Sequence, residues 1–425
     1  MSKPGTGPNL WHHADFMKLW AGQTISLIGS QISFLVLPLV ATITLGATPL
    51  QMGFLTAASA LPSLVIGLHA GALIDRHERR PVMIASDIGR AILLGLVPLA
   101  WAIDLLSMEL LYVVAILGGM LTLFFDVAYQ AFLPTIVDRD HLVEGNSKFA
   151  QSAAAAEIAG PTLGGWLVQL VSAPFAIVVD AISYLVSALL LARIRSSEPK
   201  PVSSDRPQRL SAEISEGLRV VLGDPRLRVI VGSRGILNLF NAMLEAVFVL
   251  YIVRSLGVSA GSLGFIFAAG SVGFLIGAML PGRIGDQFGV GWATIGGVAL
   301  VGLSDLLVPL ASGSPIVVVP MLVVAQFLFG LGLTVFNVHQ TGLRQALVPD
   351  HLRGRATATS RVLVTALIPV GALLGGIAGE VIGLRATLMI AALGELLAAF
   401  WIWNSPLRTL RVLPVSLDEA APGTV

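Results

Sequence analysis

The chain has 425 residues, of which 55% are apolar and 12% are charged, and its formal net charge is +1. A soluble domain carries roughly a quarter charged residues, so this composition excludes an ordinary soluble protein and indicates a polytopic membrane protein. The near-zero net charge gives no support to nucleic-acid binding, and the absence of cysteine excludes disulfides and thiolate metal sites.

The apolar segments predict an all-α fold. A transmembrane helix needs roughly 20 mostly apolar residues. The first apolar segment is too long for a signal-peptide core, so we expect it to be retained as the first helix. The rule predicts twelve transmembrane spans, near 17–44, 51–73, 82–104, 109–135, 148–171, 174–194, 228–253, 261–284, 290–311, 316–343, 357–382 and 385–405.

These spans divide the chain into two six-helix bundles. The predicted parts are an N-terminal bundle (1–195), a cytoplasmic linker with an amphipathic helix (196–227), a C-terminal bundle (228–405) and a cytoplasmic tail (406–425). Most Lys and Arg residues fall in loops on the N-terminal side of the membrane, whereas the opposite loops hold Arg254 and Arg385. Cytoplasmic loops are enriched in these residues, so we expect both termini in the cytoplasm and the chain in a prokaryotic inner membrane.

The two halves repeat one another. Gln130 and Asp140-His141-Leu142 recur about 210 residues later as Gln340 and Asp350-His351-Leu352, as expected of a transporter with internal repeats. Gly165 recurs in the same register as Gly375.

A dense run of charge separates the second and third predicted spans. It has the pattern G-x-L-x-D-R-x-x-R-R, with Gly71, Asp75, Arg76, Arg79 and Arg80. The glycine permits close helix packing, and the aspartate can meet the positive end of a helix. The run resembles the corresponding loop of major facilitator superfamily (MFS) transporters, which implies a gate on the cytoplasmic side. The alternative is a charged anchor without a gating role.

A second motif, Gly160-Pro161-x-x-Gly164-Gly165, lies in the fifth predicted span. Proline bends a helix and glycines allow close packing. The motif resembles the antiporter motif of MFS exporters, which implies efflux; the alternative is a kink that encodes no direction. The resemblance to the branch with macrolide and siderophore (enterobactin-type) exporters extends over Leu133-Pro134, Asn146, Arg344-Gln345, Pro349 and Arg353-Gly354-Arg355.

Polar side chains form stripes at helical spacing on spans one, four, seven and ten. These spans line the cavity in MFS folds, and polar groups inside a membrane are costly unless they serve a function. The candidate cavity residues are Gln23, Ser30, Tyr129, Gln130, Asn238, Asn241, Asn337 and Gln340.

Carboxyl groups within spans are candidates for proton binding, because a carboxyl in a partly dry cavity can bind and release a proton as the cavity changes sides. Asp126 and Glu245 lead, followed by Glu157 and Asp180; the alternative is that each pairs with a neighbour for helix packing. Asp180, Asp305 and Glu395 lie on spans that are peripheral in this fold, and for them packing is the favoured interpretation.

The chain has no P-loop motif, so the predicted energy source is an ion gradient. We expect no cofactor and no bound metal. The sequence shows neither a metal cluster nor a nucleophile–base pair, so we do not expect an enzyme. The sequence predicts a monomeric MFS efflux transporter that exchanges a small amphipathic, macrolide- or siderophore-like molecule for H⁺ by a rocking motion in the lipid bilayer. Alternatives are an importer, a lipid or lysolipid translocator, and a non-transporting scaffold or sensor.

Overall fold

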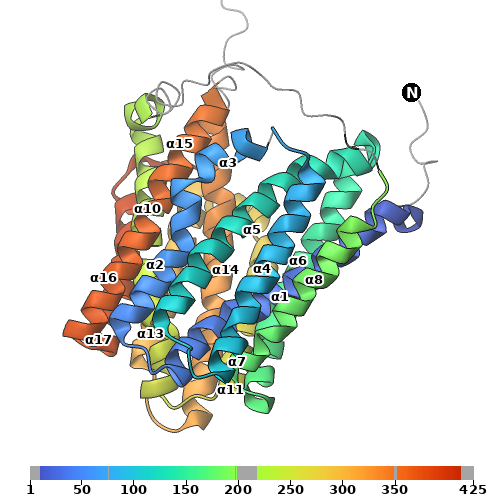
Figure 1. Ribbon diagram of the computed structural model, residues 1–425. Coiled ribbons are helices and arrows are strands. Elements are labelled where there is room, and N and C mark those ends of the chain that lie inside the picture. The colour runs from blue at the N-terminus through green and yellow to red at the C-terminus, as the bar shows by residue number, and fades with distance from the viewer. Residues whose placement is uncertain (1–9, 75, 197, 199–217, 349–351, 413–425) are drawn as a thin grey trace, which may run out of the picture. The chain divides into compact units, whose positions relative to one another are not determined.

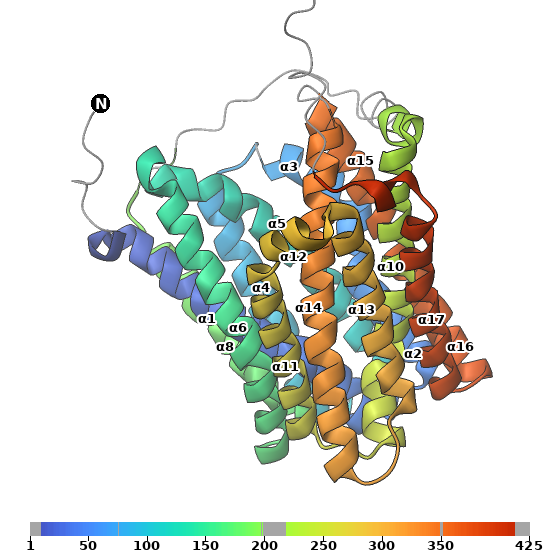
Figure 2. The same cartoon turned by 180° about the vertical axis from the view of Figure 1, so that it is seen from behind.

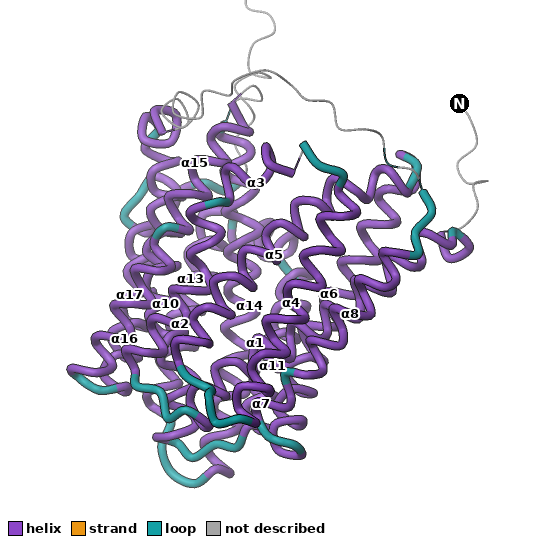
Figure 3. Tube along the Cα trace, viewed as in Figure 1, coloured by secondary structure: helices purple, strands orange, loops and turns teal. Residues whose placement is uncertain are grey.

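The computed structural model describes residues 10–74, 76–196, 198, 218–348 and 352–412. Within these residues every regular element is a helix, which confirms the all-α prediction (Figure 3). Ten of the described helices are long and apolar enough to cross a membrane. The other two predicted spans coincide with α2 (Pro49–Val65) plus α3 (Gly67–Ile74), and with α6 (Leu142–Leu170).

The contacts divide the chain into two compact units. The first contains the described residues of Met1–Gly46 and Leu61–Asp205, and the second those of Ala47–Ala60 and Arg206–Val425. The beginning of α2 therefore packs with the second unit, although it lies within the predicted 1–195 bundle. Most of the predicted amphipathic linker helix lies outside the described residues. Within the described part, residues 218–223 are helical.

The first unit contains η1 (Leu10–His12), α1 (Ala14–Leu39), η2 (Val40–Thr44), α3, α4 (Arg79–Ala102), α5 (Met108–Ile136), η3 (Arg139–His141), α6, α7 (Ala173–Ala176) and α8 (Val178–Ala192). Helix α1 packs on α6 and α8, and α4 packs on α5 and α8 (Figures 1 and 2). Phe16, Phe125 and Phe132 are fully enclosed in its core. This packing brings faces of α1, α4, α5 and α8 together.

The second unit contains the start of α2 and α10 (Pro225–Leu250), η4 (Tyr251–Ser255), α11 (Ala260–Met279), α12 (Pro281–Phe288), α13 (Val290–Leu310), α14 (Pro315–Leu347), α15 (Arg353–Thr365), α16 (Leu367–Val381), α17 (Leu384–Trp403) and η6 (Pro406–Thr409). Helix α14 packs on α11 and α13, while α17 packs on α10 and α13. Phe336 and Leu343 lie in the core of this unit.

The backbone repeats at nearly the same interval as the sequence motifs. Helices α1 and α10 each end in a π-helical segment, η2 and η4, and each segment is followed by a glycine with φ +65°, Gly46 and Gly257. Ser172 and Gly383, which precede α7 and α17, also share a positive φ. These irregularities recur in pairs, so the internal repeat extends to local backbone geometry.

Helix α2 approaches α16 through two glycines. A Cβ added to Gly53 would lie 2.6 Å from the Ala372 carbonyl oxygen and 2.9 Å from the Cα of Gly376. One turn earlier on α2, the Leu50 N–H donates to Glu380 Oε2 at 3.4 Å. Small residues let helix backbones come this close, which explains why the start of α2 belongs to the second unit.

Candidate functional site

Arg90 forms the centre of a buried charged cluster in the first unit. On α4 its Nη2 lies 2.5 Å from Oδ1 of Asp87, and Arg90 and Asp87 are 5% and 0% exposed. The guanidinium lies over the rings of Tyr184 and Phe125, with its Cζ 4.1 and 4.6 Å from their centroids. Its Nη1 donates to Thr122 Oγ1 at 3.4 Å. Arginine is therefore held by one carboxylate, two aromatic faces and a hydroxyl.

Helix α8 brings a second buried carboxyl, Asp180, to the same cluster. Its Oδ1 accepts a hydrogen bond from Ser183 Oγ at 3.0 Å. A Cβ added to Gly29 of α1 would lie 2.5 Å from this oxygen, so α1 passes directly over the carboxyl. On the same face of α8, the hydroxyl groups of Tyr184 and Ser30 lie 2.8 Å apart. Charge on Arg90 acts electrostatically on Asp180.

Helix α5 contributes Asp126 and Tyr129. Asp126 is exposed and lies within the electrostatic influence of Arg90. The Tyr129 ring stacks on Phe125, with the ring centroids 6.4 Å apart, so it borders the ring that Arg90 covers. Four predicted residues are thus connected with Arg90: Ser30 and Tyr129 contact its aromatic neighbours Tyr184 and Phe125, and its charge acts on Asp126 and Asp180.

Three other predicted residues of this unit are not among the contacts of Arg90. Gln130 is exposed on α5, and Glu157 is exposed on α6. Gln23 is half-buried, and its Oε1 has no hydrogen-bond partner among the described residues.

The predicted polar residues of the second unit form separate contacts. Asn337 Oδ1 accepts a hydrogen bond from Arg234 of α10, and Asn238 Nδ2 donates to the Val364 carbonyl at 3.4 Å. Asn241 Nδ2 donates to Glu395 Oε1 at 3.4 Å. Gln340 is buried, whereas Glu245 is exposed on α10.

Asp87 and Arg90 are not among the predicted site residues, although the sequence contains a signal for both. Both are ionisable residues inside an apolar stretch, which is a default indicator of function. Arg234 and Arg344 carry the same signal in α10 and α14. These arginines lie in the second unit, and the charge of Arg344 acts on Arg234.

The predicted gating loop is described in part. Asp75 lies outside the described residues, and Arg76 is exposed. A Cβ on Gly71 would meet no described atom within 4 Å, so close packing does not account for this glycine.

The start of α4 is capped by Glu198. The Arg79 N–H donates to its carboxylate at 2.9 and 3.0 Å, and the Arg80 N–H does so at 3.2 Å. Arg80 also donates to the carbonyls of Leu191 and Ala192 at the end of α8. The linker thus supplies the anion that the first turn of α4 lacks.

The glycines of the Gly160-Pro161 motif pack α6 against α1. A Cβ on Gly160 would overlap Gln31, and a Cβ on Gly164 would lie 3.2 Å from the Ile32 carbonyl oxygen. Gly165 is buried, and α6 continues through Pro161 without interruption. Gly371 and Gly375 of α16 make equally close contacts with α10, so both halves use this packing.

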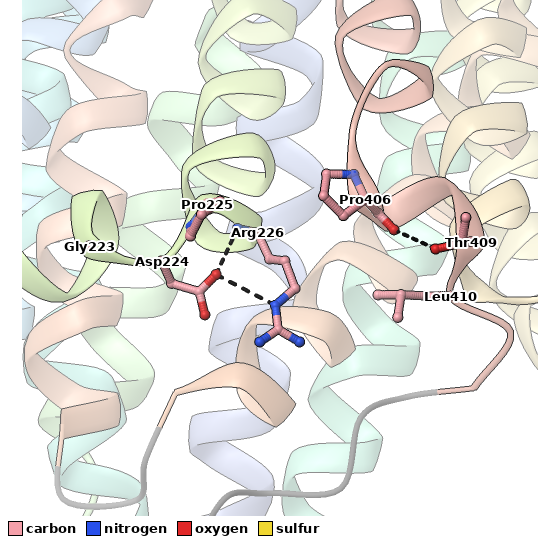
Figure 4. Close-up of a pocket in the computed structure, with 7 residues that line it drawn as sticks. All are labelled: Gly223, Asp224, Pro225, Arg226, Pro406, Thr409 and Leu410. Carbon is pink, nitrogen blue, oxygen red and sulfur yellow. Dashed lines mark hydrogen bonds and ion pairs between the residues drawn. The ribbon is translucent and has the colours of Figure 1, made fainter.

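A surface pocket lies between the start of α10 and η6 (Figure 4). Asp224 accepts from the Arg226 N–H at 2.7 Å, and Thr409 Oγ1 donates to the Pro406 carbonyl at 2.9 Å. None of the predicted cavity residues lines it. In the part of the chain that the structure describes, no three His, Asp or Glu side chains gather as a metal site would require.

Known proteins resemble the chain over most of its length. It is 24% identical over 377 residues to macrolide efflux protein A of Streptococcus pyogenes, covering 87% of this chain and 90% of that one. It is 27% identical over 362 residues to the multidrug efflux pump Tap of Mycolicibacterium fortuitum, covering 82% and 85%.

Solved structures share the fold. A bacterial homologue of the iron transporter ferroportin in an inward-facing state has a TM-score of 0.73 at 17% identity, covering 91% of this chain and 97% of that one. The nucleoside transporter NupG has a TM-score of 0.71 at 12% identity, covering 91% and 98%. Residues 9–419 match the family of transmembrane secretion effectors. The chain therefore belongs to this family of the major facilitator superfamily and is an integral membrane transporter rather than an enzyme.

Proposed function

We propose that this transporter exports a small amphipathic molecule in exchange for H⁺ across a prokaryotic inner membrane. The observation that carries the proposal is the charge balance of the cluster around Arg90. This single guanidinium pairs with Asp87, and its charge also acts on the carboxyl groups of Asp126 and Asp180. An uncompensated buried charge is expensive, so one guanidinium balances one carboxylate.

Because both remaining carboxyl groups lie inside membrane-spanning helices, they need another positive partner, either a proton or a cationic group of the substrate. If proton and substrate compete for the same carboxyl, binding of one releases the other, which is the requirement for exchange. Asp126 is the exposed member of the cluster and is therefore the carboxyl that a solute can reach first. In this scheme Arg90 and Asp87 form the fixed ion pair, and Asp126 exchanges its proton.

The direction of transport is inferred from two further features. The Gly160-Pro161-x-x-Gly164-Gly165 motif resembles that of exporters, and two relatives carry the names macrolide efflux protein and multidrug efflux pump. Two helical units related by an internal repeat are suited to alternating access through rocking. The amphipathic character of the substrate rests on these relatives and on the mixture of aromatic and polar side chains around Arg90.

The proposal is tested by proton movement in inside-out vesicles when macrolides or other amphipathic amines are added. Wild-type vesicles are expected to show substrate-induced proton release. Asp126→Asn is expected to abolish this release at matched expression, because the amide cannot exchange a proton. Glu109→Gln, which changes an exposed carboxylate at the start of the same helix, is the control and should retain the wild-type signal.

Glu245→Gln separates the two predicted proton sites, because Glu245 belongs to the second unit. Loss of release in Glu245→Gln alone would transfer the exchange site to α10 and contradict the role of Asp126. Substrate flux without proton movement in the wild type would contradict H⁺ exchange altogether.

A further inference from the structure

Asp305 and Glu395 form a carboxyl pair in the core of the second unit. Asp305 lies on α13 and Glu395 on α17, and their side chains are 2% and 0% exposed. The helices are held together at this level by close packing: a Cβ on Gly302 would lie 2.7 Å from Leu396 Cδ2. Both carboxyl groups are therefore buried where α13 and α17 pack closely, on helices expected from the sequence to be peripheral.

Asp305 and Glu395 interact with residues of the second unit. Each carboxyl group acts electrostatically on the other, and Glu395 Oε1 accepts from Asn241 Nδ2 at 3.4 Å. Asp305 Oδ2 and Glu395 Oε2 are buried and have no hydrogen-bond partner among the described residues. Asn241 was predicted to line the substrate cavity; in the structure its amide is directed to this pair.

A hydrogen bond between these two buried carboxyl groups would require a proton on one of them, because an ionised carboxylate can only accept. Two carboxylates in such a site would also repel each other without a solvent shell to screen them. We propose that Asp305 and Glu395 share one proton and form a proton-binding site in the second unit. The proposal does not rest on the exchange at Asp126, since it concerns different helices.

Several charged side chains on the helices around this pair have hydrogen-bond partners elsewhere or are exposed. Arg385 of α17 donates through Nε to the Pro309 carbonyl at 2.7 Å, and Arg234 of α10 donates to Asn337. Glu245 of α10 is exposed, and Glu380 of α16 accepts from the Leu50 N–H. The other charged or titratable side chains on packed elements are Arg226 and Arg228 of α10, Arg283 and Asp286 of α12, His339 and Arg344 of α14, and Arg408 of η6.

None of these groups is among the charges that act on Asp305 or Glu395, for which the interacting partners are each other and Asn241. No described cation therefore replaces the proton. The proton joins α13 to α17, and its removal would place two like charges in the buried packing of these helices. The protonation state is thereby coupled to the packing of α13 against α17.

The test is infrared spectroscopy of the purified full-length protein in detergent, recorded from neutral to alkaline pH. The C=O stretch of a protonated carboxyl is separate from the bands of carboxylates. The difference spectrum between wild type and the isosteric double variant Asp305→Asn/Glu395→Gln is expected to contain one protonated-carboxyl band at neutral pH, lost in a single step at alkaline pH. Asp286→Asn, an exposed carboxylate change in the same unit, should leave the band intact.

A difference spectrum with carboxylate bands alone at neutral pH would overturn the proposal, as would the disappearance of the band on addition of Na⁺, which would indicate a cation site. If the double variant does not fold, labelling wild-type protein with carboxyl-¹³C glutamate and aspartate in separate samples serves the same purpose. A shared proton predicts one neutral-pH carboxyl band that both labels perturb; a band that neither label moves would contradict it. The infrared experiment measures no transport. Its result therefore does not depend on whether Asp126 exchanges a proton.

Discussion

Ser172 occupies a backbone conformation that suits glycine. It precedes α7 with φ 121° and ψ 161°, and its hydroxyl has no hydrogen-bond partner among the described residues. In the second half, Gly383 precedes α17 with φ 86° and ψ 157°. A side chain in this region is strained, and nothing that Ser172 contacts through its hydroxyl compensates for the strain.

We expect Ser172→Gly to stabilise the folded chain by about 1 kcal/mol, because relief of strain of roughly 1–3 kcal/mol exceeds the entropy that glycine adds to the unfolded state. The measurement is the midpoint of thermal unfolding in detergent. Gly383→Ala is the matched control and should lower the midpoint. A lower midpoint for Ser172→Gly would mean that the serine side chain makes a stabilising contact that outweighs its backbone strain.

Only some residues of the candidate site could be predicted from the sequence. Asp126 and Asp180 were identified because a carboxyl in an apolar span is costly wherever it points. That argument applies equally to Arg90, but its role depends on contacts with Tyr184 and Phe125 from two other helices. Helical spacing gives the face of one helix and does not give the residues of the facing helices. The arginine at the centre of the cluster therefore required the structure.

At the scale of elements, the contact between α2 and α16 depends on glycine in both helices. A Cβ on Gly376 would lie 2.9 Å from the Pro49 carbonyl oxygen and 3.0 Å from the Cα of Gly53. Beyond the glycines, Ala57 packs with Ala246 and Ala372 in a small buried cluster. A branched side chain at Gly53 must separate the two helices.

We expect Gly53→Val to weaken this contact by about 1–3 kcal/mol, the typical cost of overpacking. Because the chain has no cysteine, Ala57→Cys with Ala372→Cys reports the contact through the yield of thiol cross-linking in membranes. The yield should fall in the Gly53→Val background. Gly296→Val, at an exposed glycine whose added Cβ would meet no atom within 4 Å, should leave the yield unchanged. An unchanged yield with Gly53→Val would mean that α2 does not dock on α16 in the membrane.

The helices themselves could be predicted because apolar length decides where a chain crosses a membrane. The partner of α2 could not. Its apolar segment directly follows the first predicted span, so sequence order favours packing within the first half. The actual partner is selected by glycines more than 300 residues apart, Gly53 and Gly376, and such a long-range match has no local signal.

At the scale of the whole molecule, the distribution of basic residues predicts the orientation. The loop between α3 and α4 contains Arg76 and leads into Arg79 and Arg80 at the start of α4, whereas residues 103–107 between α4 and α5 contain no Lys or Arg. We therefore expect the first loop in the cytoplasm and the second outside the cell. The two loops are joined by α4 alone, which is 24 residues long and therefore long enough to span the bilayer.

The orientation can be measured with single cysteines, because the parent chain has none and gives no background. Leu105→Cys, at a side chain that is 68% exposed, should react with a membrane-impermeant thiol reagent on intact cells. His77→Cys, also at an exposed position, should react only after the membrane is permeabilised. The reverse pattern would place the arginine-rich loop outside, and the same conformational cycle would then correspond to uptake. Labelling of both sites on intact cells would instead contradict the single crossing by α4, so this pair of variants tests the topology and the direction of transport that depends on it.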